Sequence, residues 1–184
     1  MRFSENRMVA FVVLAVCVLI SIVGFGGMGL ARERNRVLTV YDRGSDPSQT
    51  TRHSVDAYLD SAAENASLMA SEARLHMEGS PAIDTVADLA EKVASEADTN
   101  ARYEAFSALK TAADKLYDAM YGAVSGSDFT NFKVAYDNFW ESANRIKYDD
   151  YTKLAASYNS LISGFPGGLV AKITGQGPLN TFGG

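Results

Sequence analysis

Cysteine, histidine and tryptophan are scarce in this sequence. Cysteine occurs only at Cys17, which excludes a disulfide within the chain and a metal site built on several thiolates. Neither of the two histidines, His53 and His76, belongs to a Glu-x-x-His pair, the pattern that marks di-iron helical bundles. We therefore expect no metal site and no bound cofactor.

Positive charge is also limited. The chain has 17 Lys and Arg residues against 22 Asp and Glu, a net charge of -5, and no basic block. Because nucleic-acid binding needs a basic field, we expect no nucleic-acid partner. Phosphate-binding loops, dinucleotide-binding fingerprints and the Gly-x-Ser-x-Gly turn of serine hydrolases are absent as well.

Carboxylates are plentiful, but no spacing marks out a catalytic pair. They fall on the polar faces of predicted helices, where solvation is the simpler interpretation: Glu64, Glu72, Asp114, Asp118, Glu141, Asp149 and Asp150. Asp149 and Asp150 stand between Tyr148 and Tyr151, and this tetrad is either a recognition patch or two half-buried tyrosines with solvated aspartates, which we favour. We predict that the protein is not an enzyme.

One long apolar run is present, from Met8 to Ala31, without a charged residue. Roughly 20 apolar residues suffice for a helix to cross the bilayer core. We predict a single transmembrane anchor at residues 8–31, preceded by a short tail at 1–7. A cleaved signal peptide is the alternative, since Gly29-Leu30-Ala31 has the small-x-small form of a cleavage site, but the run is longer than a usual signal core.

Arginines flank this run on both sides. Arg2 and Arg7 precede it, and four arginines follow it, namely Arg32, Arg34, Arg36 and Arg43. The excess after the run favours a cytoplasmic position for the remainder of the chain. Residues 32–49 form a predicted juxtamembrane connector, in which the turn-forming residues 44–47 should end any helix that leaves the membrane.

Apolar residues recur at helical spacing from Val55 onward. The first stripe alternates steps of four and three, a pattern typical of helices packed at coiled-coil angles: Val55, Leu59, Ala62, Ala66, Met69, Ala73 and His76. Further stripes start after Ser80-Pro81, which is a helix-start signal, and after Asp98-Thr99-Asn100. A last, longest helix is predicted from Ser127 or Asp128 to Phe165, with a polar interruption at 147–150 and a stop at Pro166.

These stripes predict an all-α fold: an N-terminal transmembrane helix followed by an elongated antiparallel up-and-down helical bundle. The bundle should occupy residues 50–166, in helices of roughly 25 to 35 residues, and a glycine-rich tail residues 167–184. No segment shows strand alternation. Phe165 lies at the end of the last stripe and is predicted to be buried there; the alternative is an exposed Phe165 that docks a partner.

The last third of the chain resembles the LemA family. The matching residues are Asn144-Arg145-Ile146, Tyr148-Asp149, Tyr158-Asn159, Ile162, Phe165-Pro166 and Leu169-Val170-Ala171. The resemblance covers residues 129–184 and is weak before them, where the Arg-Arg-x-Asp-Leu-Ile-Pro-Asn-Leu stretch of the family is missing. It implies a bacterial origin, a membrane anchor and an antiparallel helical bundle.

The resemblance supplies no reaction, because the family as a whole has no defined activity. Its motif residues transfer to this chain as structural or binding positions: Asn144, Arg145, Tyr158, Asn159, Phe165 and Pro166. In this role Asn159 would tie the last long helix to the tail by hydrogen bonds, and Phe165 would fill the gap where the chain turns.

Composition and resemblance together favour a membrane-anchored scaffold or adaptor that binds a protein partner. The bilayer itself would be the partner of residues 8–31. A ligand-sensing bundle is the alternative, with Tyr103, Tyr117 and Trp140 lining a pocket between helices. An enzyme ranks third, since it would need a cleft with perturbed carboxylates or histidine.

Overall fold

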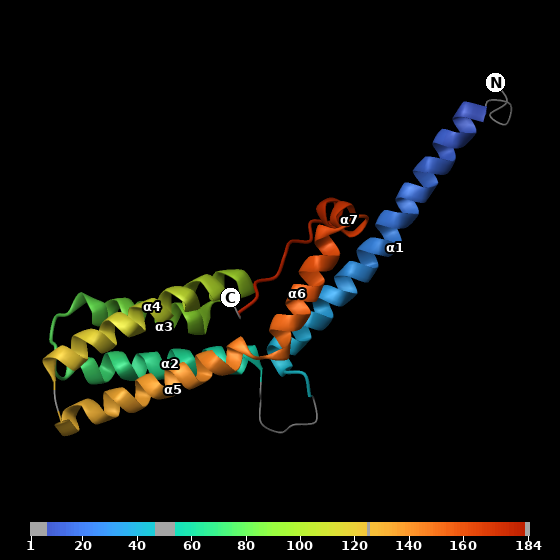
Figure 1. Cartoon of the computed structure of the whole chain (residues 1–184). Coiled ribbons are helices and arrows are strands. Elements are labelled where there is room, and N and C mark those ends of the chain that lie inside the picture. Colours follow the sequence, from blue (N-terminus) through green and yellow to red (C-terminus); the bar gives the residue numbers. More distant parts are fainter. Residues whose placement is uncertain (1–6, 47–53, 125, 183–184) are drawn as a thin grey trace. The chain divides into compact units, whose positions relative to one another are not determined.

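A computed structural model describes residues 7–46, 54–124 and 126–182 of the chain (Figure 1). All regular secondary structure in these ranges is helical, which confirms the all-α prediction. The elements are α1 (Arg7–Arg43), α2 (Val55–Arg74), α3 (Pro81–Ser95), α4 (Thr99–Ala123), the short 3₁₀ helix η2 (Gly126–Phe129), α5 (Thr130–Lys147), α6 (Asp150–Ser163) and α7 (Gly167–Thr174). Contacts divide the chain into an anchor unit, residues 1–38 with 154–179, and a bundle unit, residues 39–153 with 180–184.

The bundle unit is built on four consecutive helices, α2 to α5, which run up and down as predicted (Figure 1). Helix α2 packs against both α3 and α5, and α3 packs against α4. The buried face of α2 is rich in alanine, including Ala62, Ala66 and Ala73. Small side chains on this face let the neighbouring helix backbones approach closely.

Local sequence signals determine where these helices begin. Ser80 and Pro81 start α3 as predicted, with the proline in the first turn, where its missing N–H costs no hydrogen bond. The predicted break at residues 98–100 is the boundary between α3 and α4, and Asp98 caps α4. Helix α5 starts at Thr130, slightly later than the predicted start at Ser127 or Asp128, because η2 precedes it.

The predicted single helix from residue 127 or 128 to Phe165 is wrong, because α5 ends at Lys147 and a separate α6 begins at Asp150. The carboxylate of Asp149 accepts a hydrogen bond of 2.8 Å from the backbone N–H of Tyr151. This contact starts a new helix at the polar interruption. The helices α2 to α5 are 15 to 25 residues long, and three of the four are shorter than the predicted 25 to 35 residues.

The anchor unit contains α1 as far as Leu38, most of α6, and α7. Helix α1 continues unbroken to Arg43 and ends where Gly44, at φ +79°, donates its N–H to the Val40 carbonyl. Gly44 is the first residue of the predicted turn cluster, and glycine adopts a positive φ there without steric cost. An 18-residue window of α1 has a mean hydropathy of 3.0 with none of its residues buried, so α1 is long and apolar enough to cross a membrane.

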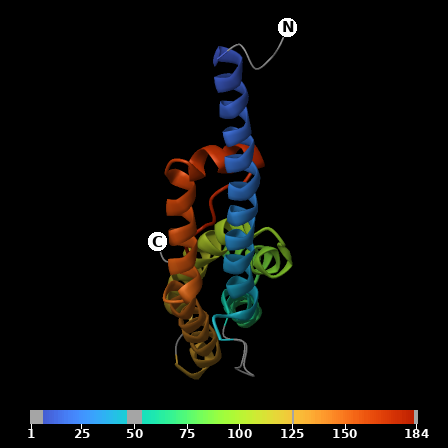
Figure 2. The ribbon, with the colours of Figure 1, turned by 90° about the vertical axis from the view of Figure 1, so that its right-hand side faces the viewer.

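Helix α7 packs against α1 inside the anchor unit, and both views place the two side by side (Figures 1 and 2). A Cβ atom built on Gly27 would lie 2.9 Å from Thr174 Cγ2, closer than real Cβ contacts. A side chain at this position would force Thr174 to shift, whereas glycine lets α7 lie against α1 without that adjustment. The predicted tail thus begins with a regular helix of eight residues.

Candidate functional site

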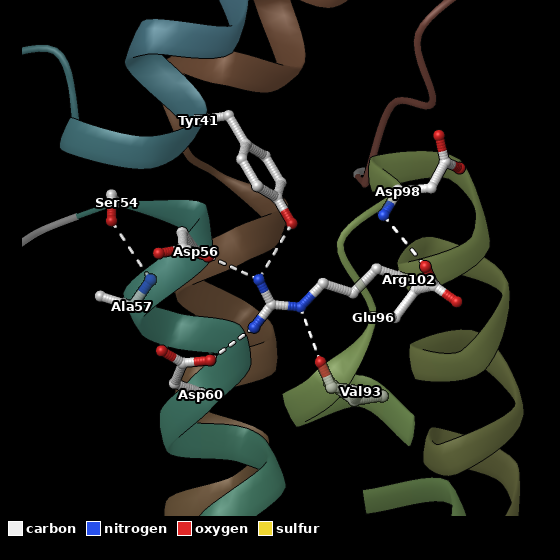
Figure 3. Close-up of polar contacts among 9 residues, drawn as sticks. All are labelled: Tyr41, Ser54, Asp56, Ala57, Asp60, Val93, Glu96, Asp98 and Arg102. Carbon is white, nitrogen blue, oxygen red and sulfur yellow. Dashed lines mark hydrogen bonds and ion pairs between the residues drawn. The ribbon is translucent and has the colours of Figure 1, made fainter. Parts of the chain in front are cut away.

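A buried arginine lies at the centre of the polar contacts in the bundle unit (Figure 3). The Arg102 guanidinium donates to Asp56 Oδ1 and Asp60 Oδ1, each at 2.5 Å, and to the Val93 carbonyl at 2.7 Å. Its Nη1 also donates to the Tyr41 hydroxyl at 3.5 Å. We call this set of five residues the arginine centre; it joins the end of α1 to α2, α3 and α4.

Helix caps position the charged groups of this centre. Asp98 accepts hydrogen bonds from the N–H groups of Asn100 and Ala101, which places Arg102 in the first turn of α4. Ser54 caps α2 through the N–H of Ala57, so that Asp56 and Asp60 follow one turn apart on one face. Carboxylates in the first turns of α2 also interact favourably with the helix dipole.

The surroundings of Tyr41 and Arg102 keep these two groups in their ordinary charge states. Burial raises the pKa of Tyr41 to about 12, against the opposing charge of Arg102, so the phenol stays protonated at neutral pH. Burial alone would lower the pKa of Arg102, but Tyr41, Asp56 and Asp60 raise it above its usual range. With its donors engaged by protein acceptors, Arg102 serves to join four helices.

A polar groove runs between α2 and α5. It comprises a cavity of about 540 Å³, lined by Tyr58, Glu141, Asn144, Arg145, Tyr148, Asp149 and Asp150, and an adjoining cavity of about 450 Å³ that shares three of these residues. Arg145 crosses it, paired to Glu141 at 2.6 Å and stacked over the Tyr58 ring at 5.9 Å. The groove thus contains the predicted motif residues Asn144 and Arg145.

The tyrosine–aspartate tetrad does not form one patch, and the favoured prediction of two half-buried tyrosines is wrong as well. Tyr151 is fully buried, whereas Tyr148 is 75% exposed. Burial raises the pKa of Asp149 above its ordinary value, and the charge of Asp150 raises it further, although the Tyr151 N–H opposes both effects. Asp149 is therefore a helix-capping residue at the start of α6.

An aromatic surface covers the region where α4, η2 and α5 meet. It consists of Tyr117, Tyr121, Phe129, Tyr136 and Trp140, which form a chain of ring contacts. Tyr117 and Tyr136 lie closest, with ring centroids 4.2 Å apart. Tyr121 is 71% exposed, and the other four rings are partly exposed.

One polar contact fixes this surface. The Tyr136 hydroxyl donates a hydrogen bond of 2.8 Å to Asp114 on α4. Burial and this bond raise the pKa of Tyr136 to about 12, so the phenol remains a donor at neutral pH. The surface therefore presents rigid aromatic area together with polar hydroxyl groups, the combination that protein interfaces favour.

The remaining motif residues lie in the anchor unit. Asn159 binds the tail as expected from the resemblance: its Nδ2 donates to the Leu179 carbonyl at 2.7 Å, and its Oδ1 accepts from the Leu179 N–H at 2.9 Å. The Tyr158 hydroxyl contacts Gln176 at 3.0 Å. The peptide bond between Phe165 and Pro166 is cis, and Pro166 precedes α7.

The prediction that Phe165 is buried is wrong, because its side chain is 88% exposed. Helix α6 ends at Ser163, so Phe165 lies beyond the helix, whereas Tyr158 on the same predicted stripe is buried. The tail is held instead by Leu179 and Phe182, which are both buried.

The pocket residues proposed for a ligand-sensing bundle are used in ring packing. Tyr103 packs edge-on against Phe182 with centroids 5.1 Å apart, and Trp140 packs edge-on against Phe139 at 5.6 Å. Tyr117 lies on Tyr136, as described above. The three rings contact different neighbours and do not line a common cavity among those described here.

The candidate metal-binding groups are not brought together. His76 is exposed beyond the end of α2, and His53 lies outside the described residues. Within residues 7–46, 54–124 and 126–182, no group of three or more His, Cys, Asp or Glu side chains could hold a metal ion.

Sequence reasoning missed Arg102 and Phe182. A signal for Arg102 was present, because Arg102, Phe106, Leu109, Ala113, Leu116 and Met120 continue the alternation of steps of four and three. A charged residue in register with an apolar stripe predicts a buried ion pair. Phe182 is isolated among glycines, and no periodicity indicates its burial.

Comparison with protein-family models, with curated proteins and with solved structures yields no match for this chain. Its function is therefore argued from its own geometry.

Proposed function

We propose that this protein is a membrane-anchored helical scaffold or adaptor, without catalytic activity, that docks a protein partner on its aromatic surface. The observation that carries the proposal is the exposure of that surface. Five aromatic rings from α4, η2 and α5 form one connected patch, with Tyr121 at 71% exposure. Tyrosine and tryptophan are enriched at the energetic centres of protein interfaces.

Membrane anchorage is supported by α1. Its residues from Met8 to Ser21 are almost all exposed, with no charged residue among them. An exposed apolar helix of this length is unfavourable in water and favourable in a bilayer. The helix also continues through the small-x-small site at Ala31 to Arg43, and cleavage there would remove Gly26 and Gly27, against which α7 packs.

The resemblance to the LemA family fits this proposal. It implies a bacterial membrane protein with one N-terminal span and a helical bundle. The arginines that follow the apolar run, in the second half of α1, favour a cytoplasmic bundle unit.

The docking surface can be tested by site-specific photo-crosslinking of the full chain in native membranes. A photoreactive phenylalanine analogue replaces Tyr121, and the matched control carries it at Tyr148, which has a similar exposure of 75% in the polar groove. We expect a discrete cross-linked product from position 121 alone. Equal products from both positions, or a product only from position 148, would contradict the aromatic surface as the docking site.

The anchor can be tested separately. Alkaline carbonate washing should leave the full chain in the membrane fraction, with Met1 and residues 2–31 still attached. Release into the supernatant, or a mature N-terminus at Arg32, would replace the anchor with a signal peptide.

A further inference from the structure

The corner between α6 and α7 exposes an apolar stripe. Leu161 lies near the end of α6, Phe165 lies in the turn, and Leu169 and Ile173 lie one turn apart on α7. All four side chains are exposed, Phe165 at 88% and Ile173 at 58%, and we call this set the apolar stripe. Single exposed apolar residues are ordinary, but several gathered at one corner mark an interaction surface.

This stripe lies beside the apolar segment of α1, within the same unit of the chain. Val170 of α7 faces Gly26, where a Cβ atom would lie 3.3 Å from Val170 Cγ2, and Thr174 faces Gly27. Val170 and Ala171 are buried, so the inner face of α7 is occupied and its outer face carries Leu169 and Ile173. The outer face of α7 is therefore exposed to the same medium, water or lipid, as the neighbouring part of α1.

We propose that the corner from Leu161 to Thr174 enters the lipid interface beside α1 as a second membrane contact. The proposal rests on the membrane anchorage proposed above. It assigns Phe165, Leu169 and Ile173 to the boundary between headgroups and acyl chains. The exposed Phe165, which was expected to fill a gap in the protein, is then covered by lipid.

The depth of α7 along α1 agrees with this placement. Arg32 is the first charged residue after the apolar run and marks the headgroup level. Gly27 precedes it by five residues, or about 7.5 Å of helix. The apolar face of an interfacial helix reaches about 5–10 Å into the boundary between headgroups and acyl chains, so α7 meets α1 at an interfacial depth.

Enough of α1 remains to cross the bilayer core. The segment from Met8 to Gly26 contains 19 residues and spans about 28 Å as a helix. The hydrocarbon core is about 30 Å thick, so this segment is long enough to cross it. The remaining residues of the apolar run, 27–31, then lie at the level of the interface.

The charges of the corner also suit a lipid surface. Residues 161–174 contain no Asp or Glu, although the chain as a whole has a net charge of -5. Their one charged side chain is Lys172, which is exposed next to Ile173 and can extend its ammonium group toward anionic headgroups. A surface that docks a protein would more often carry a rim of polar residues around such a stripe.

A helix of eight residues would bind a bilayer weakly by itself. Here α1 holds the corner at the membrane surface, so insertion becomes an intramolecular step at high effective concentration. The glycines at positions 26 and 27 then have a specific role, because they allow α7 to lie against the anchor at the level of the interface.

The experiment uses the full chain in vesicles of phosphatidylcholine and phosphatidylglycerol. A fluorophore sensitive to polarity is attached either to the native Cys17, at the midpoint of Met8 to Gly26, or to an Ile173→Cys variant that also carries Cys17→Ala. A Tyr148→Cys variant with Cys17→Ala provides the reference in water. Lipids with a nitroxide near the headgroups, lipids with a nitroxide near the bilayer centre, and aqueous iodide serve as quenchers.

We expect the label at position 173 to show blue-shifted emission and to be quenched mainly by the nitroxide near the headgroups. The label at Cys17 should be quenched mainly by the nitroxide near the bilayer centre. Unshifted emission and iodide quenching at position 173, with deep quenching at Cys17, overturns the interfacial corner and leaves the anchor intact. Iodide quenching at both positions overturns the corner together with the anchor. A label at position 173 that neither nitroxide nor iodide quenches is covered by protein, which also overturns lipid contact.

Circular dichroism of each labelled variant shows whether it is folded. Ile173 is more than half exposed, and the packing of α7 on α1 is made by Val170 and Thr174, so the substitution leaves those contacts in place. If helix content nevertheless falls, a Leu169→Cys variant on the same stripe replaces it, with the same expected quenching.

Discussion

Arg102 is a buried cation whose acceptors come from three other helices of the bundle unit. Desolvating a guanidinium is costly, and its attraction to Asp56 and Asp60 offsets that cost only while the geometry is kept. The position is therefore sensitive to changes that leave the two carboxylates or the Val93 carbonyl without a donor.

We expect Arg102→Ala to lower the free energy of unfolding by about 1 to 3 kcal/mol, because the buried Val93 carbonyl loses its donor while Asp56 and Asp60 stay partly exposed to water. Arg102→Lys should recover only part of it, because a single ammonium group cannot reach both carboxylates and the carbonyl. Urea unfolding of the full chain in detergent measures the change. Arg145→Lys, on an exposed pair with Glu141, is the control and should have little effect; equal losses from the two lysine variants would contradict the structural role of Arg102.

Asp149 gives a pH-dependent prediction. Burial, with the charge of Asp150, raises its pKa in the folded protein above the unfolded value. The stabilising contribution of a group with a raised pKa is complete below its unfolded pKa and is lost as pH rises through its folded pKa. At neutral pH the ionised carboxylate is therefore less favourable than a neutral acceptor of the same shape.

Asp149→Asn should then stabilise the protein at neutral pH, since its amide oxygen can still accept from the Tyr151 N–H. The difference from the wild type should shrink as the pH falls through the raised pKa of Asp149, and it should vanish below the ordinary pKa of aspartate. Asp149→Ala removes the acceptor and should cost about 1 kcal/mol, the typical value of a helix cap. Urea unfolding across this pH range distinguishes the variants, and a stabilisation by Asn that is independent of pH would contradict the electrostatic explanation.

At the scale of elements, α6 and the tail are joined by the paired hydrogen bonds between Asn159 and Leu179. The Asn159 side chain satisfies both backbone groups of a tail residue that belongs to no helix. Because a buried backbone group without a partner is costly, this pair holds an otherwise irregular segment in one conformation.

Asn159→Asp should release the tail, because a carboxylate cannot donate to the Leu179 carbonyl. Hydrogen exchange at the Leu179 amide should become faster, while α6 amides remain protected. Tyr158→Phe, which removes only the contact with Gln176, is the control and should leave Leu179 protected. Unchanged exchange at Leu179 in the Asn159→Asp variant would show that other contacts hold the tail.

The helices themselves could be predicted because apolar stripes and caps are local. Ser80-Pro81 and Asp98 begin α3 and α4 where the sequence places them. The division between α5 and α6 was missed for a physical reason: the stripe continues on both sides of residues 147–150, and only the Asp149 contact with the Tyr151 N–H determines that a new helix starts.

The candidate site was less predictable, because its contacts join distant residues. Asp56 and Asp60 lie on α2, and Arg102, more than 40 residues away in the sequence, pairs with both. The aromatic surface was only partly foreseen, since Tyr117 and Trp140 were assigned to a pocket whose existence depends on how α4 and α5 pack. Asn159 was foreseen through the resemblance, whereas Phe165 was misplaced because the turn at Pro166 decides its exposure.

At the scale of the whole molecule, the chain passes between the two units three times, after Leu38, Lys153 and Leu179. The bundle unit therefore includes Tyr41 from the end of α1 and Phe182 from the tail. Phe182 packs against Tyr41, Tyr103 and Tyr151, with centroids 6.0, 5.1 and 5.9 Å apart. A contiguous segment from residue 50 to 166 would lack both Tyr41 and Phe182.

This arrangement predicts opposite outcomes for two phenylalanines of the C-terminal region. Phe182 is buried, so Phe182→Ala should lower the free energy of unfolding by about 3 to 5 kcal/mol, through lost transfer energy and the cavity left behind. Phe165 is 88% exposed, so Phe165→Ala should leave the stability of the detergent-solubilised protein unchanged. Urea unfolding followed by the fluorescence of Trp140, in α5 of the bundle unit, measures Phe182→Ala, and circular dichroism, which also includes the helices of the anchor unit, measures Phe165→Ala. A large loss from Phe165→Ala would mean that this side chain is covered by protein, and an unchanged stability of Phe182→Ala would mean that the tail does not complete the core of the bundle unit.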